Sequence, residues 1–257
     1  MFIAFTSGMS IELEHSHDPL SIADRVGGKT QHSYLRDFVY GAIDGTVTTF
    51  AVVSGVAGAG LDAKIVIVLG AANLLADGFS MAASNYLGTR TEDQLRQKAR
   101  AMEHKHIRHV PEGEREEVRQ IYAAKGFEGD DLERAVEIIT SDEKRWVDTM
   151  LVDELGVSLE SPSAIKAAAT TFFAFCLVGL LPLLPFIYGH FVPTDGNLMY
   201  SISAIVTGIA FFLVGAAKSY FVDQHWSWSG LETLTIGGVA ASIAYLVGVL
   251  LKGTVGS

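Results

Sequence analysis

Five apolar stretches constrain this 257-residue chain more than any other feature. Crossing the hydrocarbon core of a bilayer takes roughly 20 mostly apolar residues, because the core is about 30 Å thick and a helix rises about 1.5 Å per residue. The stretches that meet this length lie at about residues 38–61, 65–88, 165–189, 200–222 and 232–251. Backbone polar groups in lipid must be satisfied within their own segment, so each stretch is expected to be a helix. The sequence therefore predicts an all-α, polytopic membrane protein with five transmembrane helices.

A charged block separates the second and third apolar stretches. Residues 90–160 hold 12 of the 19 Lys and Arg residues and 18 of the 29 Asp and Glu residues. Good helix formers, with boundaries at Pro111, Gly126 and Gly156, predict two or three amphipathic helices. We therefore expect a mobile N-terminal tail (1–35), spans 1 and 2 (36–89), a helical insert (90–162) and spans 3 to 5 (163–257).

The distribution of basic residues predicts the orientation in the membrane. The link between spans 1 and 2 contains only Lys64, and the link between spans 3 and 4 contains no Lys or Arg. The insert and the segment before span 1 are rich in both. Because cytosolic segments carry the excess of Lys and Arg, the N-terminus and the insert are expected in the cytosol, and the C-terminus outside.

Two carboxylates within the predicted spans point to ion handling. Asp44 lies in span 1 and Asp77 in span 2. Charged groups in the bilayer are costly, so their presence indicates a function. Asn73, Asp77, Met81 and Asn85 recur every fourth residue and form a polar stripe along one face of span 2. Such a stripe must face protein or water.

Structural alternatives remain open for these residues. Asn85 is also suited to an interhelical hydrogen bond, and Met81 to core packing. Asp44 is alternatively a structural carboxylate paired with Lys218 or a backbone donor. Gly41 and Gly45 have the G-x-x-x-G spacing that lets two helix backbones approach, which would place Asp44 at a helix–helix seam.

Three pairs of potential metal ligands share helix faces in the insert. The pairs are Glu103 and His106, Glu114 and Glu117, and Met150 and Glu154. Carboxylate, imidazole and thioether together suit a divalent metal such as Fe²⁺ or Mn²⁺, although charged residues on a soluble helix can also serve solvation alone.

Two further classes of protein compete with a metal carrier. The Glu103-x-x-His106 motif resembles half of a ferritin-like signature, which would indicate a membrane-attached di-iron ferroxidase, but residues 90–160 contain no second copy. The other rival is a scaffold whose insert docks partners, and it leaves Asp44 and Asp77 unexplained.

Four motifs in order carry a family resemblance. "YGAIDGTVTTFAVVSGVAGAGL", "ADGFSMAASNYLGTRTE", "PEGEREEVRQIY" and "DELGV" resemble the vacuolar iron transporter family, from about Arg36 to the C-terminus. The resemblance implies a homodimer that exports Fe²⁺ from the cytosol in exchange for protons, for iron storage or detoxification, with Mn²⁺, Co²⁺ and Zn²⁺ as alternative ions. It implies no enzyme activity, no permanently bound cofactor and no nucleic-acid partner. The host would be the inner cell membrane of a prokaryote or a vacuolar membrane of a eukaryote.

The resemblance also implies which residues handle the ion. Asp44 and Met81 would line a path at the dimer seam, and the insert would be a cytosolic metal-binding domain. Its ligands would be Glu103, Glu114, Glu117, Met150 and Glu154.

The chain departs from the family pattern at several of these positions. His106 stands where the family favours a glutamate, and Leu151 where a second methionine is common. In span 2 Asn73 replaces a frequent acid, with Asp77 one turn further along. Before span 1, where two acids a turn apart are frequent, the chain has Ser33 and Asp37.

Overall fold

The computed structural model describes residues 16–27, 33–221 and 224–255, and the regular structure in these ranges is helical. The chain divides into two units, Met1–His32 and Ser33–Ser257. In the first unit, helix α1 (Pro19–Gly27) follows Asp18, whose carboxylate accepts a hydrogen bond from the Ser21 backbone at 3.1 Å. The segment that we expected to be a mobile tail thus contains a helix. Residues 1–15 and 28–32 of that prediction lie outside the described residues.

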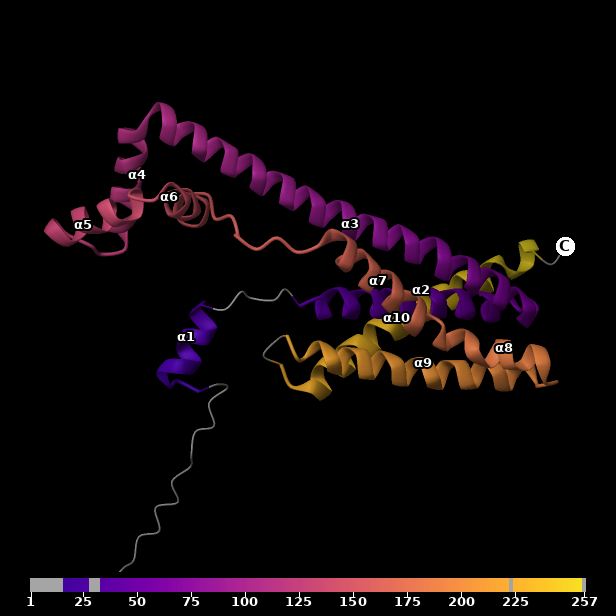
Figure 1. Cartoon of the computed structure of the whole chain (residues 1–257). Helices are drawn as coiled ribbons and strands as arrows, with labels where there is room; N and C mark the ends of the chain where they lie inside the picture. The colour runs from indigo at the N-terminus through magenta and orange to yellow at the C-terminus, as the bar shows by residue number, and fades with distance from the viewer. Residues whose placement is uncertain (1–15, 28–32, 222–223, 256–257) are drawn as a thin grey trace, which may run out of the picture. The chain divides into compact units, whose positions relative to one another are not determined.

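The second unit contains five helices long and apolar enough to cross a membrane, which confirms the predicted fold class (Figure 1). They are α2 (Leu35–Ala59), α3 (Ala63–His109), the segment Ala164–Phe191, α9 (Gly196–Lys218) and α10 (Trp226–Val255). The third span consists of α7 (Ala164–Gly179), a 3₁₀ turn η2 (Leu181–Leu183) and α8 (Leu184–Phe191). The turn falls at Pro182, where the missing N–H interrupts the α-helical ladder.

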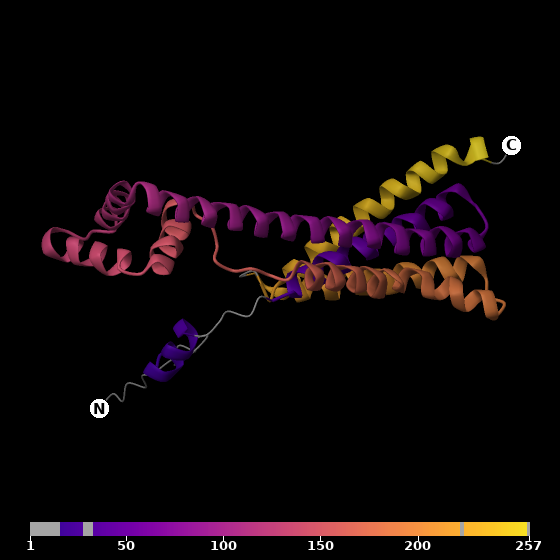
Figure 2. The same ribbon diagram turned by 45° about the horizontal axis from the view of Figure 1, so that its top comes forward.

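Helix α3 continues well beyond the length that a membrane requires. Its 47 residues correspond to about 70 Å, more than twice the hydrocarbon thickness (Figures 1 and 2). We expected the insert to begin with a helix of its own after residue 90, but no break occurs there, because residues 89–109 contain neither Gly nor Pro. The helix ends at His109, two residues before Pro111. One rigid element therefore joins the second span to the insert.

The remainder of the insert is formed by short helices. These are α4 (Pro111–Ala124), α5 (Gly129–Thr140), α6 (Glu143–Thr149) and the π-helical turn η1 (Met150–Glu154). We expected a single helix over residues 130–156, but it breaks at Ser141 and Asp142. The Asp142 carboxylate caps α6 by accepting a hydrogen bond from the Arg145 backbone N–H at 2.8 Å. Val118, Val136, Trp146 and Met150 form the apolar core that holds these helices together.

Glycines bring α2 and α7 into close contact. A Cβ atom on Gly41 would collide with the Thr171 carbonyl oxygen, and one on Gly45 with the Phe175 carbonyl oxygen. The close approach that the G-x-x-x-G spacing predicts is thus made to α7 of the same chain. Phe175 lies at the centre of the adjoining core, which also contains Val53 and Leu74.

Candidate metal centre

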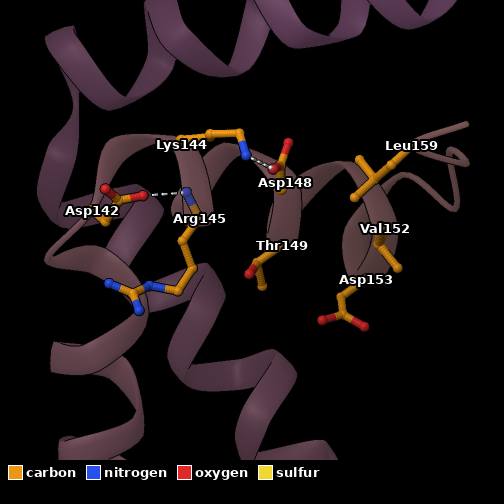
Figure 3. A pocket seen from close by; sticks show the side chains of 8 residues that line it. All are labelled: Asp142, Lys144, Arg145, Asp148, Thr149, Val152, Asp153 and Leu159. Atoms are coloured by element: carbon orange, nitrogen blue, oxygen red, sulfur yellow. Dashed lines mark hydrogen bonds and ion pairs between the residues drawn. The ribbon is translucent and has the colours of Figure 1, made fainter. Parts of the chain in front are cut away.

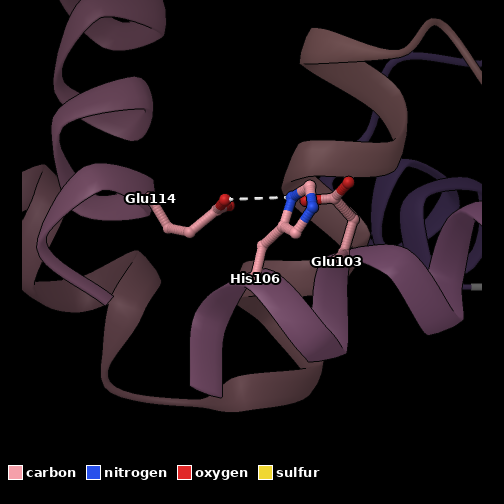
Figure 4. A group of neighbouring side chains, drawn as sticks. All are labelled: Glu103, His106 and Glu114. Atoms are coloured by element: carbon pink, nitrogen blue, oxygen red, sulfur yellow. Dashed lines mark ion pairs between the residues drawn. The ribbon is translucent and has the colours of Figure 1, made fainter. Parts of the chain in front are cut away.

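The turn between α3 and α4 positions the acidic residues of the insert. Pro111 starts α4 directly after the end of α3, and its fixed φ suits the first turn of a helix. The chain therefore turns sharply within a few residues (Figure 1). Glu114, in the first turn of α4, faces Glu103 and His106 on the last turns of α3 (Figure 4).

Three side chains from the two helices form a compact group of metal-ligating atoms. One ligand atom each from Glu103, His106 and Glu114 lies within 4.8 Å of the others. His106 Nδ1 is 3.3 Å from Glu114 Oε1. Two carboxylates and an imidazole at this separation are a donor set that suits a divalent transition metal.

The burial of the two glutamates requires that their charge be neutralised, by a proton or by a cation. Glu103 is 1% and Glu114 is 3% exposed, and the Oε2 atom of each has no hydrogen-bond partner among the described residues. An unsatisfied buried polar group costs about 1–3 kcal/mol, and more when it is charged. A bound metal ion would satisfy both oxygens at once.

The electrostatics of the cluster also favour a cation. Burial, and then the negative charges of Glu117, Glu103 and Glu154, raise the pKa of Glu114 to about 7. Partial burial, and then the charges of Glu103 and Glu117, raise the pKa of Glu154. All four predicted carboxylates therefore lie within electrostatic reach of one another. A divalent ion relieves this repulsion and displaces the proton from Glu114 at neutral pH.

The π-helical turn η1 holds the remaining two predicted ligands in different surroundings. Met150 is fully buried against Val118 and Trp146 in the apolar core, whereas Glu154 is exposed at the end of the turn. Single π-turns are rare and frequently occur at functional sites. The sequence pairs Met150 with Glu154, but in the structure Met150 lies in the apolar core and Glu154 lies at the surface.

Ion pairs that the sequence analysis did not identify fix η1 and α6 in place. Lys125, after α4, pairs with Asp153 at 2.6 Å, and Arg100 on α3 pairs with Asp148 at 2.6 Å. Since Asp153 precedes Glu154, the Lys125 pair restrains the turn that carries this carboxylate. These residues lie 28 and 48 positions apart, so no local spacing could have indicated the contacts.

The surface of the insert also contains a hollow that lies apart from the metal-ligating group. It is lined by Asp142, Lys144, Arg145 and Asp148, among others (Figure 3). Asp148 is paired with Lys144 at 3.9 Å as well as with Arg100, and Asp142 caps α6. Asp148 is thus neutralised by two cations and Asp142 is engaged as a helix cap, so the hollow is a poor cation site.

In the membrane-spanning part, Asp44 and Asp77 lie close enough for their charges to repel each other. Asp44 is half-buried on α2, and its carboxylate accepts no hydrogen bond from the described residues. Lys218, the partner considered from the sequence, instead pairs with Glu232 at 2.7 Å. The structure therefore does not form the Asp44–Lys218 pair.

Some residues of the polar stripe on α3 pack between helices, and others are exposed. Asn73 donates to Thr48 Oγ1 at 3.2 Å, and Asn85 donates to Asp37 Oδ1 at 2.8 Å and to Thr171 Oγ1 at 2.7 Å. These hydrogen bonds connect α3 with α2 and α7, as the packing alternative for Asn85 predicted. The bond to Asn85 holds Asp37, in the first turn of α2, against α3.

The other members of the stripe lie in different environments. Met81 packs against the apolar core, whereas Asp77 is exposed on the single chain, as are Ser80 and Ser84, which flank the stripe on α3.

Helix α3 thus has Glu103 and His106 near one end, where Glu114 of α4 meets them, and Asp77 within its apolar half, an arrangement suited to a membrane protein that handles metal ions. A model of the VIT family matches residues 35–249, and the chain belongs to this family. Since its relatives are named transporters, the di-iron enzyme considered from the sequence is not supported.

Three relatives illustrate the similarity. A vacuolar iron transporter of Toxoplasma gondii is 34% identical over 236 residues, which cover 89% of this chain and 78% of the relative. One of Centaurea cyanus is 32% identical over 212 residues, covering 82% and 85%. Vacuolar iron transporter 1 of Arabidopsis thaliana is 31% identical over 217 residues, covering 84% and 85%.

Proposed function

We propose that this protein exports Fe²⁺ from the cytosol across its membrane in exchange for protons, as a homodimer. The observation that carries the proposal is the continuity of α3. The same helix presents Glu103 and His106 at one end and Asp77 in its apolar half. The metal-collecting group and the membrane carboxylate are thus parts of one rigid element. The names of the relatives support iron as the ion.

Collection of the ion would take place on the insert. Glu103, His106 and Glu114 supply oxygen and nitrogen donors, with Glu117 and Glu154 adding negative charge around them. Fe²⁺ accepts such a mixed set, and Mn²⁺ is the next most suitable ion because it prefers oxygen. Co²⁺ and Zn²⁺ are further candidates.

Transfer through the membrane would use the carboxylates of spans 1 and 2. Asp44 offers oxygen, and Met81 offers sulfur on the neighbouring helix. Binding of a divalent ion requires deprotonated carboxylates, so an ion entering this region releases protons. The same carboxylates can then carry protons back, which is the physical minimum for exchange. Asp37 and Asn73 would border the path.

A homodimer would explain the exposed polar face of α3. In a single chain, Asp77, Ser80 and Ser84 would face lipid, and a charged group near the bilayer centre costs about 2.5–3.5 kcal/mol on insertion scales. A second copy covering this face removes the cost. The basic-rich insert would lie in the cytosol and the C-terminus outside, by the positive-inside rule.

The decisive test is coupled flux in liposomes. Fe²⁺ uptake and internal pH would be followed together for the unmutated protein and for Asp44→Asn, which keeps shape but cannot ionise. We expect the variant to fold and dimerise yet to lose both fluxes. Asp130→Asn, an equivalent change at an exposed position on the insert, should transport normally. Unchanged Fe²⁺ and proton flux in folded Asp44→Asn would refute the proposed path.

A further inference from the structure

A large pocket opens at the end of the helical bundle from which the insert emerges. Its volume is about 690 Å³, and it lies where α2 begins, α9 ends and α10 begins (Figure 1). Its lining includes Arg36 and Tyr40 on α2, Lys218 on α9, Phe221 and Gln224 in the link after α9, and Glu232 on α10. None of these residues belongs to the metal centre or to the proposed ion path.

The charges of this pocket leave one cation without a carboxylate partner. Lys218 Nζ and Glu232 Oε2 are 2.7 Å apart and neutralise each other. The guanidinium of Arg36 lies over the Tyr40 ring at 5.3 Å, and no carboxylate of the described residues pairs with it. Tyr40 is 50% exposed, so the stacked pair borders the opening. The described residues that line the pocket therefore carry a net positive charge and a planar donor group suited to phosphate.

An apolar extension leads from the pocket along α10. A neighbouring hollow of about 550 Å³ shares Gln224 and Glu232 with it and continues over Trp228, Leu231 and Ile236. Trp228 is 64% and Ile236 is 56% exposed. Tryptophan is enriched at the level of lipid headgroups, with the apolar chains beyond it. A free phosphate in water would gain nothing from this extension, whereas an acyl chain would.

We propose that this pocket binds an anionic glycerophospholipid, with the phosphate on Arg36 and an acyl chain along Trp228, Leu231 and Ile236. Basic pockets between transmembrane helices on the cytosolic side commonly hold anionic headgroups. The bound lipid would join α2 to α10 at the point where α2 enters the bilayer. The inference rests on the membrane embedding and the pocket, and not on transport activity.

Titration of the purified full-length protein with lipid, followed by native mass spectrometry, tests the proposal. We expect phosphatidylglycerol to bind more tightly than phosphatidylcholine with the same acyl chains. Arg36→Gln should weaken phosphatidylglycerol binding about fivefold, which corresponds to one interfacial charge contact. Arg36→Lys keeps the charge but loses the planar donor group, so it should bind phosphatidylglycerol more tightly than Arg36→Gln and less tightly than the unmutated protein, and it guards against a loss caused by misfolding.

The chain offers a matched control in Arg90. This arginine lies over the Tyr86 ring at 5.8 Å, as Arg36 lies over Tyr40, but it does not line the pocket. Arg90→Gln should leave phosphatidylglycerol binding unchanged. If Arg36→Gln and Arg90→Gln weakened the binding equally, the effect would come from the general surface charge, and the proposal would be overturned. Equal affinity for the two lipids would also overturn it. The last measurement adds soluble glycerol phosphate as a competitor. If it displaced the lipid at equal concentration, the pocket would be a site for free phosphate, and the assignment to lipid would be overturned.

Discussion

At the scale of single residues, the insert gathers negative charge where water is excluded. Glu103 and Glu114 are about as completely buried as the apolar core residues of the insert. A carboxylate in such surroundings is either protonated or bound to a cation. The raised pKa of Glu114, about 7, lies at the pH where these two states compete. Metal binding and protonation are thus alternative ways to neutralise one site.

Glu114→Gln tests this competition through stability. Because the pKa of Glu114 is about 7 in the folded state and about 4.5 in an unfolded chain, the folded state holds an extra proton between these values. Metal-free stability should therefore fall as pH rises from 4.5 to above 7. Glu114→Gln should flatten this dependence and stabilise the chelator-treated protein at pH 8 by about 2 kcal/mol. Thermal unfolding at several pH values, without and with Fe²⁺, measures the metal-free stability and the stabilisation by metal.

The same variant should respond weakly to metal. Fe²⁺ should raise the unfolding temperature of the unmutated protein more than that of Glu114→Gln, since the amide is a poorer ligand. Glu116→Gln, on the same helix but at the surface, is the control and should behave as the unmutated protein does. A metal response in Glu114→Gln as large as the unmutated one would exclude this carboxylate as a ligand.

At the scale of elements, two packing features define the molecule: the close contact of α2 with α7 and the unbroken length of α3. The first could be predicted from the G-x-x-x-G spacing, although the partner helix could not, because spacing indicates that a face is small and not what covers it. Gly41 and Gly45 contact α7 of the same chain. Substitutions there should therefore harm the folding of each subunit before they harm assembly.

Gly45→Ala measures the contact between α2 and α7. The added methyl group meets the Phe175 backbone, which cannot move like a flexible side chain, so we expect a loss of about 1–3 kcal/mol. Gly88→Ala is the matched control, since no atom lies within 4 Å of its Cβ position, and it should be neutral or stabilising by up to about 1 kcal/mol. Thermal unfolding in detergent would compare them. Equal stability of the two variants would contradict the packing described.

Glu92→Pro tests whether the continuity of α3 matters for transport. Proline in the exposed middle of this helix removes one backbone hydrogen bond and bends the helix, at a cost of about 3 kcal/mol. We expect the insert to keep its Fe²⁺ binding while flux in liposomes falls. Glu92→Ala removes the same charge without the bend and should transport normally. Full flux in a folded Glu92→Pro protein would show that transport does not depend on a rigid connection between the metal-ligating group and the membrane carboxylate.

At the scale of the whole molecule, the sequence predicts the spans better than the insert. Spans are recognised by length and apolarity, which the bilayer imposes locally. The break at Ser141, the π-turn η1 and the pairs of Lys125 and Arg100 depend on contacts between distant residues. Likewise, helical spacing grouped the ligands by pairs, but only the sharp turn at Pro111 shows that Glu103, His106 and Glu114 meet. Met150, paired with Glu154 from the sequence, lies in the apolar core.

Assembly can be tested through the exposed polar face of α3. With Cys176→Ala removing the single cysteine, Ser84→Cys should be joined to its counterpart by a short bifunctional maleimide in membranes, since a second copy is expected to cover this face. Ser201→Cys, also exposed but on α9, should remain unlinked because the proposed interface lies on α3. Denaturing gels would report the fraction of linked dimer. Preferential linking through the cysteine at position 201 would place the interface elsewhere, and so would a dimer in sedimentation that is not linked through position 84. Asp77 would then face lipid, and nothing in the sequence explains why a chain would retain a carboxylate there at such an energetic cost.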